Sequence, residues 1–102
     1  MHKLKDTRPA FERLLRDKSN TGQSKRAANF ILGAWWNADS CGGFDIVDVF
    51  NVDESIAADM ATVFSYVASR PITEYPEEYR AEIEEIIRRW RPKVSQARQA
   101  RA

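Results

Sequence analysis

Apolar residues recur at helical spacing along most of the chain. A first predicted helix covers residues 6–17, with Asp6 or Thr7 as its cap and Pro9 in its first turn. Its core-facing residues are Phe11, Leu14 and Leu15. A second predicted helix, capped by Thr21 or Ser24, runs to Ala38. Apolar residues surround much of it: Ala27, Ala28, Phe30, Ile31, Leu32, Ala34, Trp35, Trp36 and Ala38. A helix that is apolar on several sides normally lies at the centre of a domain, so we expect it to form the hub of the core.

Two glycines separate this helix from a short apolar segment. Gly42 and Gly43 end the second helix, because paired glycines favour sharp reversals of the backbone. Residues 46–50 are predicted to form a short helical turn capped by Asp45. The weak alternation of this segment also allows a strand, so both structures remain open.

Two more long helices follow. Asp53 is predicted to cap the third helix, which ends at Pro71. Its core-facing residues are Ile56, Met60, Val63, Phe64 and Val67. Pro76 opens the fourth helix and Pro92 closes it. Its core-facing residues are Tyr79, Ile83, Ile86, Ile87 and Trp90.

These elements amount to one small all-α domain. A chain of 102 residues with 43% apolar composition suits a single modest core without disulfides. We therefore expect a single-domain bundle of four principal helices plus one short helical segment within residues 1–92. Residues 93–102 form a basic C-terminal tail, whose order the pattern leaves undecided.

Charged residues are segregated along the chain. Residues 27–69 contain no Lys or Arg, and six acids fall among them: Asp39, Asp45, Asp48, Asp53, Glu54 and Asp59. Residues 1–26 carry eight basic and three acidic side chains, and residues 70–102 carry eight basic and six acidic ones. The formal net charge of +1 therefore belongs to a dipolar molecule, suited to binding a charged partner or a second copy of itself.

The residue types that carry catalysis or bind metals are scarce. One His and one Cys cannot form a zinc site, and no suitable base accompanies a Ser or Cys nucleophile. The acids do not follow a calcium-loop pattern, and residues 21–26 lack the leading glycine of a phosphate-binding loop. We therefore expect no metal, no cofactor and no enzymatic activity, with residues 21–26 acting as a helix cap.

Cysteine usage and hydropathy bear on the compartment. The lone Cys41 cannot form an internal disulfide, which favours the reducing cytoplasm. No apolar run approaches the roughly 20 residues that span a bilayer. We expect a cytoplasmic protein that does not enter membranes.

Two adjacent tryptophans offer a candidate contact surface. Trp35 and Trp36 lie about 100° apart on an α-helix, so one can enter the core while the other lies at its rim. We expect Trp35 to pack in the core and Trp36 to anchor a protein partner beside an acidic loop. The predicted partner-binding residues are Trp36, Asp39, Asp45, Asp48 and Glu54.

Weak, non-sequence-specific nucleic-acid binding is the alternative. If the first helix and the end of the fourth lie together, their cations form a basic face. The residues concerned are Arg13, Arg16, Lys25, Arg26, Arg88, Arg91 and Lys93. The near-neutral composition and the apolar second helix argue against a sequence-specific helix-turn-helix reader.

Several short motifs occur together over residues 14–92. They are Thr21-Gly22-Gln23-Ser24, Ala34-Trp35-Trp36-Asn37-Ala38, Cys41-Gly42-Gly43-Phe44-Asp45, Val52-Asp53 with Ala58-Asp59-Met60, and Trp90-Arg91-Pro92. In these motifs the chain resembles a domain of unknown function encoded on proteobacterial plasmids and integrative conjugative elements. Phe50-Asn51 departs from the bulkier aromatic or Trp expected there. The resemblance implies a mobile-element context and supplies no catalytic residues.

Overall fold

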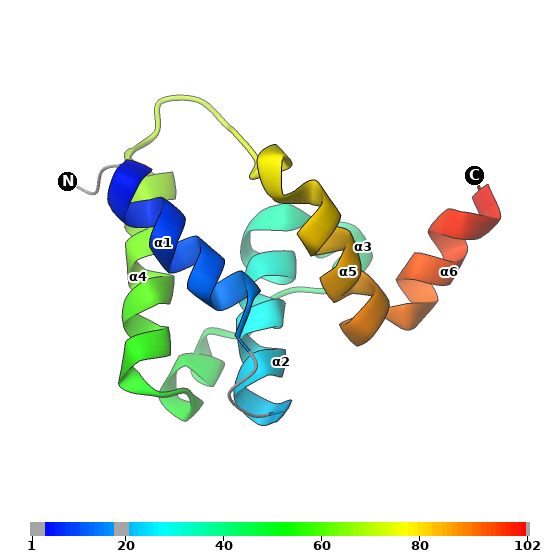
Figure 1. Cartoon of the computed structure of the whole chain (residues 1–102), viewed down its shortest axis with the longest axis horizontal. Helices are drawn as coiled ribbons and strands as arrows, with labels where there is room; N and C mark the ends of the chain where they lie inside the picture. The colour runs from blue at the N-terminus through cyan, green and yellow to red at the C-terminus, as the bar shows by residue number, and fades with distance from the viewer. Residues whose placement is uncertain (1–3, 18–20, 102) are drawn as a thin grey trace.

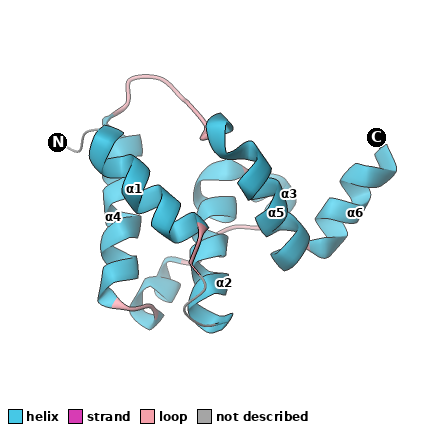
Figure 2. Cartoon of the chain, viewed as in Figure 1, coloured by secondary structure: helices cyan, strands magenta, loops and turns pink. Residues whose placement is uncertain are grey.

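Helices and the loops that join them make up the part of the chain that the structure describes. The computed structural model describes residues 4–17 and 21–101, and these ranges contain no strand (Figure 1, Figure 2). The elements, in order, are α1 (Leu4–Leu15), α2 (Thr21–Asn29), the π-helix η1 (Phe30–Trp36), α3 (Ala38–Cys41), the 3₁₀ helix η2 (Ile46–Asn51), α4 (Glu54–Ser69), the 3₁₀ turn η3 (Glu77–Tyr79), α5 (Arg80–Trp90) and α6 (Pro92–Arg101). The all-α class is confirmed, and residues 46–51 form a 3₁₀ helix rather than a strand.

The core lies where α1 meets its neighbours. Helix α1 contacts α2, α4 and α5, and it lies between α4 and α5 in the view of Figure 1. All three residues predicted for its inner face, Phe11, Leu14 and Leu15, are buried. The largest fully buried side chains are Ile31, Leu32, Val63, Ile83 and Ile87. Burying each of them contributes about 1.5–3 kcal/mol relative to an exposed position.

The first helix begins earlier than predicted, and the tail, whose order the sequence left undecided, is helical. Helix α1 begins at Leu4, so Asp6 and Thr7 lie within the helix instead of capping it, and Pro9 lies inside it rather than in its first turn. The basic tail is helical: α6 leaves the end of α5 and extends away from the other helices (Figure 1). Its Val94 packs against the core.

The second predicted helix changes type at Phe30, and this reverses the roles of the two tryptophans. In η1 the Asn37 N–H donates to the Leu32 carbonyl at 2.9 Å, which is the i→i−5 bond of a π-helix. Residues five apart then share a side, so Trp36 falls on the same side as Ile31. Trp36 is only 8% exposed, whereas Trp35 is half-buried at the edge of the core. The prediction that Trp36 lies at the rim is therefore wrong.

Gly33 allows η1 to lie directly against the loop that follows α3. A Cβ placed on Gly33 would lie 2.6 Å from the Gly43 carbonyl carbon, 2.6 Å from the Phe44 amide nitrogen and 2.7 Å from the Gly42 oxygen. All three are backbone atoms, which cannot rotate away as a side chain can. Gly42 itself has a φ of +83°, in the region that glycine adopts without strain. This close packing turns the chain back toward η2.

Helix α4 uses a narrower face than predicted. It packs chiefly against α1, through Met60, Val63 and Tyr66. Phe64 is 69% exposed and Val67 is also exposed, so the prediction that both face the core is wrong. One neighbouring helix can cover only one side of α4, and the buried Tyr66 takes the position on that side. Its hydroxyl donates to Glu74 Oε1 at 2.7 Å and ties α4 to the following loop.

Candidate binding surfaces

The predicted acidic contact loop is divided between two parts of the molecule. Asp39 lies on α3, which is held against the end of α5 because Arg91 Nε donates to the Cys41 carbonyl at 2.6 Å. Asp48 lies on η2, which contacts α2, and it faces Arg26 at 3.9 Å. The structure therefore does not bring Asp39 together with the acids of residues 45–54.

Trp36 is not available as an anchor. Its ring is buried, and the guanidinium carbon of Arg80 lies 5.1 Å from the ring centroid. Arg80 is held in turn by Glu77, at 2.6 Å. A partner would have to displace this cation–π contact to reach the indole, so the burial of Trp36 argues against its predicted role as a contact residue.

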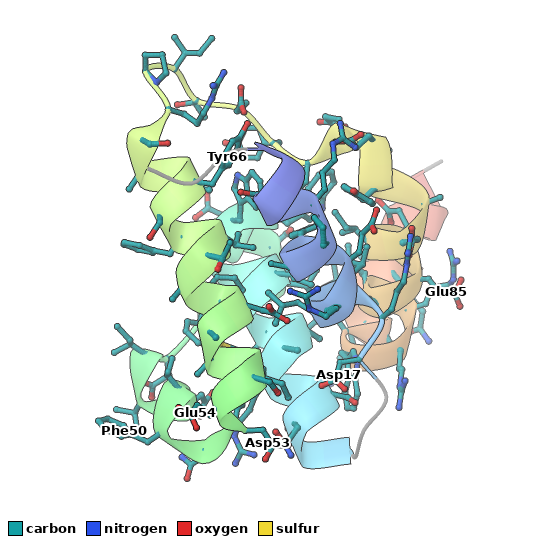
Figure 3. The ribbon with its side chains drawn as sticks, turned by 60° about the vertical axis from the view of Figure 1, so that its left-hand side comes forward. Asp17, Phe50, Asp53, Glu54, Tyr66 and Glu85 are labelled. Atoms are coloured by element: carbon teal, nitrogen blue, oxygen red, sulfur yellow. The ribbon has the colours of Figure 1, made fainter. Side chains whose placement is uncertain are left out.

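A different apolar surface is exposed on η2. Its three large side chains point to solvent: Ile46 is 76% exposed, Val47 54% and Phe50 88%. Figure 3 shows Phe50 at the outer edge of the molecule, near Glu54 at the start of α4. Together with the acids of the same segment they form what we name the η2 surface, made of Asp45, Ile46, Val47, Asp48, Phe50 and Glu54. Clusters of exposed apolar side chains rimmed by polar ones are typical of protein interaction sites.

Two aspartates fix the backbone on either side of this surface. The Asp45 side chain accepts a hydrogen bond from the Val47 N–H at 3.0 Å, so its predicted capping role is confirmed. Asp53 occupies the N-cap position of α4, but its side chain makes no capping bond. Instead its N–H donates to Gln23 Oε1 at 2.7 Å, which links the start of α4 to α2.

Most of the predicted nucleic-acid contacts are neutralised within the protein. Arg13 makes two hydrogen bonds with Asp59, at 2.9 and 2.7 Å. Arg16 makes two with Glu82, at 2.8 and 2.9 Å, and so joins α1 to α5. Arg88 pairs with Glu85. A guanidinium that already makes two hydrogen bonds to a carboxylate attracts a phosphate less strongly, because the carboxylate neutralises its charge.

The contact between α1 and α5 also shifts the pKa of Glu82. The hydrogen bond from Arg16 lowers the pKa of Glu82 below its ordinary value of 4.5. A carboxyl with a lowered folded-state pKa stabilises the fold above its ordinary pKa, and this contribution is lost as pH falls through the lowered value. Because both side chains are 40% exposed or more, solvent screens the pair and keeps its contribution small. The shift therefore indicates a structural ion pair.

Arg91 is occupied inside the structure. Besides the Cys41 carbonyl, its Nη2 donates to Asn29 Oδ1 at 2.6 Å and its Nη1 to the Trp90 carbonyl at 3.1 Å. It therefore joins the ends of α2, α3 and α5, and its predicted role in nucleic-acid contact conflicts with these bonds. Lys25 and Lys93 are exposed and have no ion pair among the described side chains.

Replacing Arg91 with methionine should lower the free energy of unfolding by about 1.5–3 kcal/mol, the range for hydrogen bonds to a charged group. Methionine keeps much of the length of the side chain but leaves the Cys41 and Asn29 acceptors without this donor. Urea unfolding measures the loss. Arg88→Met is the matched control, because Arg88 pairs only on the surface and should cost less than about 1 kcal/mol. Equal losses in both variants would contradict the clamping role.

The described residues include no cluster of metal-binding side chains. No group of three or more His, Cys, Asp or Glu side chains is placed to hold a metal ion in this part of the chain. Within the same ranges, no helix combines the length and apolarity needed to cross a bilayer. Cys41 is buried.

The family of this chain follows from its sequence alone. No curated protein and no solved structure matches it. A family model matches residues 8–91, which run from the first turns of α1 to the Arg91 clamp and include η1 and the η2 surface. The chain therefore belongs to DUF7673, a family of unknown function.

Proposed function

We propose that this protein is a non-enzymatic interaction module that binds a basic, amphipathic segment of a protein partner through the η2 surface. The observation that carries the proposal is the exposure of Ile46, Val47 and Phe50 on one short helix. The exposure of three large apolar side chains does not stabilise a small domain. Burying them against a partner would remove them from water, which is favourable.

Charge complementarity defines the class of partner. Asp45 and Glu54 are exposed and Asp48 is half-buried, so the same segment carries carboxylates beside its apolar side chains. The nearest segments in sequence cannot neutralise them, because residues 27–69 contain no Lys or Arg. Arg26 Nε lies 3.9 Å from Asp48 Oδ1, a long distance for an ion pair, so it neutralises Asp48 only weakly. A partner with Lys or Arg beside apolar residues would satisfy both parts of this surface.

The setting of the proposed function comes from the sequence. The motif resemblance to proteins of plasmids and integrative conjugative elements supports a role in a bacterial mobile element. The single Cys supports a reducing, cytoplasmic site of action.

The η2 surface should bind a labelled amphipathic peptide built from Leu and Lys, measured by fluorescence anisotropy. Phe50→Ser should weaken this binding about tenfold or more, since loss of a central aromatic anchor costs about 2 kcal/mol or more. Added salt should also weaken binding, because part of the attraction is between charges.

Ile72→Ser is the matched control for this experiment. Ile72 is also an exposed large apolar residue, but it lies in the loop after α4 and outside the η2 surface. Its replacement should leave peptide affinity unchanged. If Phe50→Ser and Ile72→Ser weaken binding equally, or if the peptide does not bind, the proposal is wrong.

Weak nucleic-acid binding is the second candidate. The exposure of Lys25 and Lys93, together with the basic composition of α6, is what favours it. A labelled random duplex would then bind with a steep dependence on salt concentration, and Lys25→Ala with Lys93→Ala would weaken it. Phe50→Ser would leave such binding unchanged, which separates the two candidates.

A further inference from the structure

The outer side of α4 is a second exposed surface, which meets the η2 surface at Glu54. At helical spacing, Ala57, Ala61, Phe64 and Ala68 lie along one stripe. Ala61, Phe64 and Ala68 are exposed and Ala57 is half-buried, while α1 covers the opposite side of the helix. The stripe thus presents one large aromatic side chain among small ones.

Charge along α4 is confined to its first half and the residue that follows it. Residues 60–69 carry no charged side chain, so the middle of the outer side is neutral. Glu54 begins the helix and Arg70 follows its last residue. Arg70 pairs with Glu74 at 3.2 Å and lies over the Tyr66 ring, 5.6 Å from its centroid. Because Arg70 and Glu74 are both partly exposed, solvent screens their ion pair and keeps its contribution small.

We infer that the outer side of α4 binds the same side of a second copy, with the two helices antiparallel across a two-fold axis. A surface that meets itself cannot rely on one sign of charge, and the uncharged stretch satisfies this condition. When the stripe is reversed on itself, Phe64 lies opposite Ala61 and Ala57 lies opposite Ala68. Each phenyl ring then has a small residue to pack over.

The charges at the ends of α4 select the antiparallel direction. Reversal brings Glu54 of one copy to the Arg70 end of the other, so opposite charges meet. In a parallel pair, Glu54 would face its own copy and Arg70 would face Arg70. Antiparallel helices also place the positive end of one helix dipole beside the negative end of the other. The η2 surfaces then lie toward opposite ends of the pair. Glu54 of each surface faces the other copy, and the apolar side chains Ile46, Val47 and Phe50 remain open to a partner.

Sedimentation equilibrium over a wide concentration range tests self-association. The unmodified protein should form a dimer, and Phe64→Asp should shift the protein to monomer with unchanged helix content, because Phe64 is already exposed. Phe50→Asp is the matched control and should remain dimeric. A monomer for the unmodified protein at every concentration, or a dimer that survives Phe64→Asp, would overturn the inference. The peptide-binding assay is independent of this result, so failure of one proposal does not imply failure of the other.

Cross-linking tests the direction of the pair. Ala57→Cys and Ala68→Cys variants are mixed and treated with a short bismaleimide, and the products are identified by intact mass. In an antiparallel pair the mixture links, because residue 57 of one copy meets residue 68 of the other. The Ala68→Cys variant alone does not link, since the two thiols lie about 16 Å apart along the helices. The native Cys41 is buried and does not compete. Linking within each single variant, or no linking at all, would overturn the arrangement.

Discussion

Replacing Trp36 with alanine should destabilise the domain by about 3–5 kcal/mol, the usual cost of truncating a buried tryptophan. The indole is part of the core and only 8% exposed, and Arg80 covers it from outside. Alanine would leave a cavity beside η1 and remove the cation–π contact as well. Since small domains are stable by only about 5–15 kcal/mol, this loss could unfold much of the protein.

Chemical unfolding followed by circular dichroism measures this effect. Phe50→Ala is the control, because Phe50 is 88% exposed and its truncation should change stability by no more than about 0.5 kcal/mol. If Trp36→Ala melts like the unmodified protein, the indole is not part of the core, and the π-helical register of η1 is wrong.

Replacing Gly33 with alanine should also be strongly destabilising, by about 3 kcal/mol, at the upper end of the overpacking range. In an ordinary helix the same change would stabilise by about 0.5–1 kcal/mol, because alanine has the better helix propensity. Here the new methyl group would overlap the backbone of residues 42–44, at distances of 2.6–2.7 Å. Helix η1 and the loop must move apart to make room for the methyl group. The cost of this movement exceeds the gain from the higher helix propensity of alanine.

Thermal unfolding of Gly33→Ala and Gly43→Ala gives a matched comparison. A Cβ on Gly43 meets no atom within 4 Å, and its φ lies outside the positive region, so alanine there should be tolerated. A loss of stability at Gly43 as large as that at Gly33 would contradict the role assigned to the close packing of η1.

The helices were largely predictable because their signals are local. The spacing of Phe11, Leu14 and Leu15 locates the inner face of α1, and all three are buried. Prolines and glycines mark the ends of the elements, as at Pro71 and Gly42. Local propensity and side-chain period therefore determine most of the all-α fold.

The candidate surfaces were less predictable because they depend on packing between distant segments. The sequence from Ala27 to Trp36 predicts one continuous α-helix. It contains no local signal for the π-helix that places Trp36 in the core. Likewise Phe64 lies at a regular apolar position of α4, yet none of the helices in the described ranges covers it. Whether a periodic apolar residue is buried depends on which partner lies beside it, and single-sequence periodicity does not contain that information.

The basic residues show the same limit. The pairs between Arg13 and Asp59 and between Arg16 and Glu82 join residues far apart in sequence. From the sequence, these arginines were predicted to contact a nucleic acid. In the folded protein each of them pairs with a carboxylate that is distant in sequence. The exposure of the apolar residues beside the acids of residues 45–54 was not predicted. Their signal was the two apolar pairs Ile46-Val47 and Val49-Phe50 on either side of Asp48, a pattern that is equally typical of core residues.

Nuclear magnetic resonance mapping tests the central claim most directly. The ¹⁵N-labelled protein is titrated with the Leu/Lys peptide and, in a separate sample, with a random-sequence duplex. We expect the peptide to shift backbone resonances of residues 45–54 while the duplex leaves them unchanged. Shifts caused only by the duplex, and centred on Lys25 and Lys93, would contradict the η2 surface as the binding site.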